Sequence, residues 1–141
     1  MGRVINTESA GKERTQLTKA VVLALRELMK QQDLSDDTRD LAAFIGLSLS
    51  KIMESVEVSV VAWEKRDYWV KADRFRVEWM WSGRIGSAMC EAVLNDDWAT
   101  VARLSAEVGQ KLAKVKVPLR HRMGTPWVGA WDELIDARRN H

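Results

Sequence analysis

Apolar residues recur at three- and four-residue steps along most of the chain, which is the spacing of one face of an α-helix. The first such stretch predicts a helix from about Ser9 to Gln32, and its apolar stripe consists of Leu17, Val21, Leu25, Leu28 and Met29. The polar run that follows, residues 33–37, reads as a turn. Ser35 within it is a good N-cap for the next helix, since its side chain can accept a backbone N–H.

A second helix is predicted from Asp36 to Arg66, with an apolar stripe at Leu41, Ile45, Leu49, Ile52, Val56, Val60 and Trp63. The small residues Ala42, Ala43 and Gly46 would let a neighbouring helix come close. At a rise of ~1.5 Å per residue this helix would extend for about 45 Å. That length favours an elongated bundle over a globule.

Two short segments offer a rival interpretation as β-strands. Residues 56–60 alternate between apolar and polar side chains, and residues 114–117 do so more briefly, so the two could pair. The helical stripe runs through the first of these segments without a turn signal on either side. We therefore expect helix there.

The third predicted helix, Val70 to Leu94, carries tryptophans at positions 79 and 81. Positions two apart point about 200° away from each other on a helix, so this helix has a large aromatic on each of two opposite faces. A bundle with one core covers only one face. We therefore predict that the second face contacts another chain, through Trp69, Val77, Trp81, Ile85 and Ala88.

A turn at residues 95–97 precedes a fourth predicted helix, from Trp98 to about Val115. The only prolines are Pro118, which ends this helix, and Pro126, which suits the first position of a short closing helix over residues 126–139 capped by Thr125. A basic loop, residues 116–125, separates the two. The expected fold is one all-α domain, residues 1–141, with four main helices and a short C-terminal one.

Composition agrees with a folded protein, because 46% of the residues are hydrophobic and 30% are charged. Cys90 is the only cysteine, so no internal disulfide can form and a cytoplasmic location is expected. The longest uncharged stretch of the N-terminal half, residues 41–50, is far shorter than the ~20 residues of a membrane span. We expect no membrane partner.

Candidate chemistry is sparse. The only histidines are His121 and His141, so we expect neither a metal nor a cofactor. Cys90 is expected to be a buried small hydrophobe and not a nucleophile. Residues 83–87 lack the composition of a phosphate loop. Gly83, Gly86, Ser87 and Cys90 are better explained as a groove of small side chains for close helix packing.

One acidic and one basic feature remain. Glu54, Glu57 and Glu64 share the polar side of the second helix and could form a carboxylate site, although a solvated face explains them as well. Residues 108–131 contain no acid, and their cations are Lys111, Lys114, Lys116, Arg120 and Arg122. Such a segment could lie along a nucleic-acid backbone, or could simply be solvated in a chain whose net charge is only +2.

These features predict a non-catalytic scaffolding or interaction subunit, either a homo-oligomer or part of a larger protein complex. The alternative is a nucleic-acid-binding accessory protein that uses the basic segment. A second alternative is a small helical enzyme with an acidic pocket.

Overall fold

The computed structural model describes residues 7–140, and these form five α-helices and no strand. The all-α prediction is confirmed, and neither segment that could have been a strand is one. Residues 56–60 are helical, and residues 114–117 lie in a turn and loop. The helices are α1 (Thr7–Met29), α2 (Asp36–Lys65), α3 (Trp69–Leu94), α4 (Trp98–Lys111) and α5 (Ala130–Arg139).

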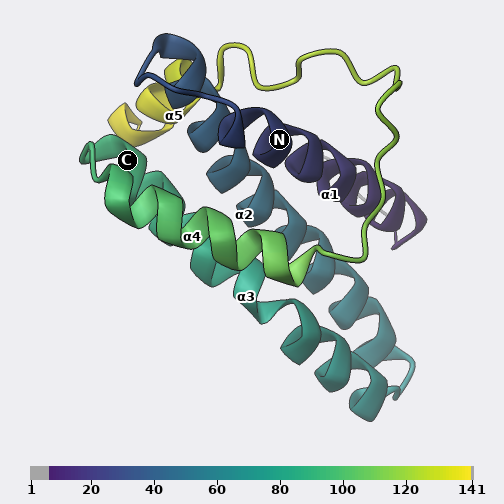
Figure 1. Ribbon diagram of the computed structural model, residues 1–141. Helices are drawn as coiled ribbons and strands as arrows, with labels where there is room; N and C mark the ends of the chain where they lie inside the picture. The colour runs from purple at the N-terminus through teal and green to yellow at the C-terminus, as the bar shows by residue number, and fades with distance from the viewer. Residues whose placement is uncertain (1–6, 141) are drawn as a thin grey trace.

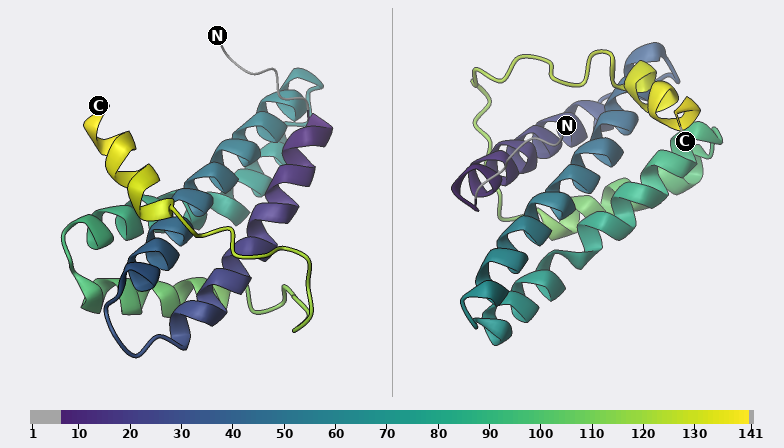
Figure 2. Two further views of the ribbon diagram at one scale, coloured as in Figure 1. Left: turned by 90° about the horizontal axis from the view of Figure 1, so that it is seen from above. Right: turned by 180° about the vertical axis from the view of Figure 1, so that it is seen from behind.

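The long helix α2 is the centre of the molecule, with α1 and α3 packed along it and α5 against it (Figure 1). Helix α4 packs on α3 and scarcely touches α1. Figure 2 shows the far ends of α2 and α3 projecting as a hairpin beyond α4. The predicted elongated shape is therefore present.

Local sequence sets the first three turns between the helices. The Ser35 hydroxyl accepts the backbone N–H of Thr38, and the Thr38 hydroxyl accepts that of Ser35, a reciprocal cap that starts α2. Asp67 and Asp96 adopt left-handed backbone conformations, with φ of 64° and 54°, at the turns before α3 and α4. Aspartate tolerates this conformation better than most residues do.

Helices α2 and α3 cross closely at a pair of glycines. A Cβ on Gly86 would lie 2.9 Å from the backbone nitrogen of Ser50 and 3.0 Å from the carbonyl oxygen of Gly46. A Cβ on Gly46 would lie 2.7 Å from the sulfur of Cys90. The expected role of these small residues in close helix packing is confirmed for Gly46, Gly86 and Cys90, whereas Ser87 is exposed.

The hydrophobic interior has two parts. The main core lies between all five helices, and its fully enclosed side chains include Leu41, Ile45, Leu49, Ile85 and Met89. The second part, here called the tip cluster, lies in the projecting hairpin and consists of Val56, Val60 and Ala72, with Met53, Trp63, Phe75 and Trp79 packed against them.

Two helices end at least three residues before their predicted C-terminal residues. Helix α1 ends at Met29 and not Gln32, because the backbone N–H groups of the next two residues bond three residues back, which tightens the last turn. Helix α4 ends at Lys111 and not Val115, and the chain turns through residues 112–114 before any proline. The stop is therefore made by the turn, and Pro118 lies beyond it.

The closing helix α5 begins at Ala130, later than the predicted residue 126. Residues 126–129 form turns, and Gly129, with φ of 88°, separates them from the helix. The cap is not Thr125: the Asp40 carboxylate of α2 accepts the backbone N–H groups of Gly129 and Trp131 at 3.2 and 2.9 Å. A carboxylate at this end also favours the positive end of the helix dipole, so α2 fixes the start of α5.

Candidate protein-interaction surface

The two tryptophans that motivated the predicted interface lie against each other. The rings of Trp79 and Trp81 stack with centroids 6.1 Å apart and planes at 22°. Both side chains are half-buried and pack against the main core. The prediction that they occupy opposite faces is therefore wrong, because indole side chains are long enough to turn along the helix surface and meet.

The predicted interface residues separate into two groups. Ile85 is fully buried in the main core of its own subunit and Ala88 packs half-buried against it, so Ile85 cannot touch a partner. Its place in the interface is corrected: Ile85 lies on the side of α3 that belongs to the main core of the same subunit. Trp69 and Val77 are 59% and 62% exposed, and Trp81 lies at the edge between core and solvent.

Exposed large apolar side chains continue along the same side of α3. Val70 is 66% exposed and Met80 is 57% exposed; the sequence reasoning missed both. Their signal was present, since Val77 lies seven residues after Val70 and three before Met80, a helical repeat. We call Trp69, Val70, Val77 and Met80 the outer face of α3.

Aromatic rings of α2 and α3 contact one another in the tip cluster, and two cations lie over them. The rings of Trp63 and Phe75 meet edge to face at 4.9 Å, and those of Phe75 and Trp79 at 6.5 Å. The Lys71 ammonium lies 4.5 Å from the Trp63 ring, and the Arg14 guanidinium lies 4.8 Å from the Phe75 ring. These cations therefore stabilise the tip cluster.

Arg14 also joins α1 to the hairpin. Its Nη1 donates to the hydroxyls of Ser55 and Ser59 at 3.3 and 3.5 Å. Partial burial lowers the pKa of Arg14 from its ordinary value. The guanidinium is held by neutral acceptors and a ring, so it acts as a structural connector.

The three glutamates on α2 do not converge on a pocket. Arg76 of α3 donates from Nε and Nη2 to the two carboxylate oxygens of Glu57, at 3.0 and 3.3 Å, and its Nη1 lies 3.9 Å from Glu64. The hydrogen bond with Glu57 raises the pKa of Arg76. Glu54 is exposed to solvent. This arrangement is a surface ion-pair group that links α2 to α3.

Cys90 is half-buried on α3 against Gly46, as expected for a small hydrophobe. Burial, with a smaller contribution from the charge of Glu91, raises the pKa of the Cys90 thiol to about 11. The thiol is therefore protonated at neutral pH and a poor nucleophile. Within residues 7–140, no three His, Cys, Asp or Glu side chains lie close enough together to bind a metal ion.

The five cations of the basic segment are all exposed, and none of them forms an ion pair within the described residues. They are distributed from the last residue of α4 along the long loop to α5. This loop passes alongside α1 in an extended path (Figure 1). Arg26 of α1 fixes this loop by donating to the carbonyl of Val117 at 2.7 Å. The cations are thus distributed along an extended segment and do not form one cluster.

The two histidines do not define a site. His121 Nδ1 accepts the backbone N–H of Met123 at 3.3 Å within the loop, and His141 lies outside the described residues.

None of the five helices is both long and apolar enough to cross a membrane. Comparison with protein-family models, with curated proteins and with solved structures found no match for this chain.

Proposed function

We propose that this chain is a non-catalytic helical subunit that pairs with a second copy of itself through the outer face of α3. One observation supports this most directly: four large apolar side chains, Trp69, Val70, Val77 and Met80, are each more than half exposed on one side of one helix. Contiguous exposed apolar surface of this kind is typical of protein interfaces.

The order of residues along α3 suits an antiparallel pair of α3 helices related by a two-fold axis. With the axis between Glu78 and Trp79, Val77 of one copy lies opposite Met80 of the other. Trp69 then lies opposite the small Ala88 near the ends of the contact. An isologous contact of this kind uses the same residues twice and closes at a dimer.

The same register also pairs opposite charges. Asp73 and Arg84, both exposed on this side of α3, lie at equal distances from the proposed axis, so Asp73 of each copy would face Arg84 of the other. Within the subunit Arg84 pairs with Glu107 of α4. Asp73 forms no salt bridge among the described residues, and its charge is one of the smaller contributions that raise the pKa of Arg76.

The test is the molar mass in solution, by light scattering over a range of concentrations. We expect a dimer for the native chain and a folded monomer for Val77→Glu, because a carboxylate buried at the centre of the contact would lose its hydration. Leu119→Glu is the matched control: Leu119 is 88% exposed on the distant loop, and its replacement leaves the dimer intact. A native monomer at tens of micromolar would contradict the proposal.

Charge reversal tests the register separately. Asp73→Arg and Arg84→Asp should each weaken the dimer, since each places like charges opposite one another. The double variant, with both changes in every copy, restores opposite charges and should recover most of the lost affinity. If Val77→Glu abolishes the dimer but the charge reversals have no effect, the interface on α3 stands and the antiparallel register is wrong.

A second function is favoured by the basic segment from Lys111 to Arg122, whose five cations are exposed and form no ion pairs among the described residues. In this role the segment lies along the phosphates of a nucleic acid, and binding falls steeply with salt. Replacing Lys114, Lys116 and Arg120 by Gln would reduce both the affinity and the salt dependence. No binding of mixed single- and double-stranded DNA and RNA at low salt would exclude this function.

A further inference from the structure

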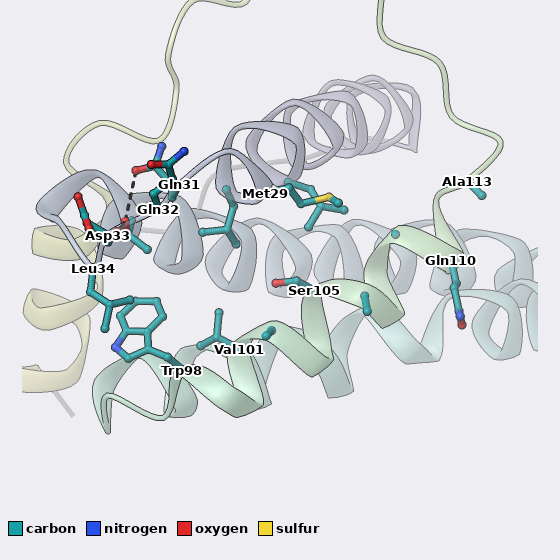
Figure 3. Close-up of a pocket in the computed structure, with 16 residues that line it drawn as sticks. Met29, Gln31, Gln32, Asp33, Leu34, Trp98, Val101, Ser105, Gln110 and Ala113 are labelled. Carbon is teal, nitrogen blue, oxygen red and sulfur yellow. Dashed lines mark hydrogen bonds between the residues drawn. The ribbon is translucent and has the colours of Figure 1, made fainter.

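A groove lies between the C-terminal half of α1 and the length of α4, on surfaces that the proposed dimer does not use (Figure 3). Its volume is about 620 Å³. Asp33, Leu34 and Trp98 lie at one end, and Gln110 and Ala113 at the other (Figure 3). The size lies within the ~300–1,000 Å³ of typical small-molecule sites.

Small side chains on and just after α4 leave much of the space of the groove open. Ala102, Ala106, Gly109 and Ala113 follow one another at three- and four-residue steps and all line the groove. The α1 side comes closest at Gly109, where an added Cβ would lie 3.6 Å from Leu25 Cδ2. The opposite wall contributes bulky apolar side chains, including Met29, which is 79% exposed.

The polar groups of the groove are few and unevenly placed. Asp33 is the only charged residue that lines it, and its carboxylate forms no ion pair or hydrogen bond within residues 7–140. Gln31 and Gln32 lie at the same end. No lysine, arginine or histidine lines the groove, so nothing in it would neutralise an anion.

Ser105 adds an independent observation. It lies on the side of α4 that faces α1 (Figure 3), and its hydroxyl is the one buried side-chain N or O atom without a hydrogen-bond partner in the described part of the chain. Buried hydroxyls are usually satisfied, and leaving one unpaired has a free-energy cost. The oxygen itself has less than 1 Å² of accessible surface, so a molecule in the groove would pair with it only after the Ser105 side chain rotates toward the groove.

Hydrogen bonds hold the polar end of the groove in shape. The Thr38 hydroxyl donates to the backbone carbonyl of Asp33 at 2.7 Å and contacts the Gln31 amide oxygen at 3.3 Å. At the start of α4, the Trp98 indole N–H donates to the Asp96 carboxylate at 3.3 Å. The site is therefore largely formed before anything binds, which lowers the entropic cost of binding.

We infer that this groove binds an elongated, mainly apolar small molecule whose polar end is neutral or cationic. The apolar part lies along the small residues of α4, against Met29 and its neighbours on α1. The polar end lies beside Gln31, Gln32 and Asp33, where a carboxylate and two amides are available. Molecules that end in a carboxylate or phosphate are excluded by charge, because Asp33 would repel them.

The first experiment uses the native chain with ¹³C-labelled methionine methyl groups, observed by NMR. The probes are dodecyltrimethylammonium, dodecyl maltoside and dodecanoate, each below the concentration at which it forms micelles. We expect the first two to shift the Met29 methyl signal saturably, with dodecanoate at least about tenfold weaker. Met80, 57% exposed on the outer face of α3, is the internal control and should not move.

Three variants locate the binding. Ala106→Trp fills the groove and should abolish the Met29 shift, whereas Ala137→Trp, at an exposed position on α5, should leave it unchanged. Asp33→Asn should reduce the affinity for dodecyltrimethylammonium and leave that for dodecyl maltoside as it was. Binding that survives Ala106→Trp, or a preference for dodecanoate, would overturn the inference.

The NMR spectra also separate this inference from the proposed dimer. Equal shifts of Met29 and Met80 with all three probes would mean non-specific surfactant binding and would overturn the groove as a site. A Met29 shift that depends on protein concentration alone, and is lost in Ala106→Trp, would make a second copy the occupant of the groove. Dimerisation through α3 instead shifts Met80 with protein concentration and leaves Met29 in place.

Discussion

At the scale of single residues, the thiol of Cys90 and the carboxylate of Asp97 show how local surroundings change an ordinary group. Cys90 loses hydration against α2, and its pKa rises to about 11. Asp97 instead gains hydrogen bonds at the start of α4, from the hydroxyl and the backbone N–H of Thr100, and these lower its pKa. Each shift has a measurable consequence.

For Cys90 we expect slow alkylation by iodoacetamide in the folded protein. At about pH 8 the thiolate is a small fraction of the thiol, and the reaction should be more than about tenfold slower than with the same chain unfolded in urea. The rate should keep rising with pH for as long as the protein stays folded. A rate that levels off near the ordinary thiol pKa would show that Cys90 is not shielded.

For Asp97 the prediction concerns stability and pH. A lowered pKa in the folded state means that the charged carboxylate stabilises the fold above its ordinary pKa, and that this contribution is lost as pH falls through the lowered value. Asp97→Ala should therefore lower the urea midpoint at neutral pH, and the difference from native should shrink below about pH 4. Asp97→Asn, which keeps a side-chain acceptor for Thr100, should show a smaller loss at neutral pH.

At the scale of elements, the crossing of α2 and α3 decides how the hairpin holds together. Two glycines face each other there, and the backbone of each helix lies where the other's Cβ would be. A glycine in a helix costs about 1 kcal/mol relative to alanine. The close contact between the two longest helices offsets that cost.

Gly86→Ala should therefore destabilise the protein by about 1–3 kcal/mol, because the added methyl group forces the two backbones apart. Gly109→Ala is the matched control: its Cβ would meet only Leu25, at an ordinary 3.6 Å, so it should be neutral or stabilising by up to about 1 kcal/mol. Urea unfolding monitored by circular dichroism measures both. Equal stabilities for the two variants would mean that the crossing is looser than described.

At the scale of the whole molecule, the sequence predicted the helices well because apolar positions recur at helical spacing, and because α2 and α4 begin at the side-chain caps Ser35 and Asp97. It could not predict the packing of Trp79 and Trp81, since the angular position of a residue on a helix does not fix where a long indole comes to lie. It also missed that Ile85 is buried within its own subunit, because the order of helices around a core is a tertiary property. The exposed Trp69 and Val77 are what remain of the predicted interface.

The groove was missed for a different reason. Much of its α4 wall is a stripe of small residues that includes Ala102, Ala106 and Gly109, and such residues show no binding signal in a sequence. Only the separation of α1 from α4 shows that their small size leaves space. In the same way, the cap of α5 could not be found locally, because Asp40 lies far away in sequence.

The docking of α5 on α2 has a consequence for the integrity of the chain. Trypsin should cut the exposed loop after Arg120 or Arg122, separating the last helix covalently from the rest. Because Trp127, Ala130 and Leu134 are buried in the main core and Asp40 holds the first turn of α5, the two fragments should stay together through gel filtration and part only in denaturant. The C-terminal piece could then be supplied as a separate peptide, which would make this protein a two-part system whose reassembly can be followed directly.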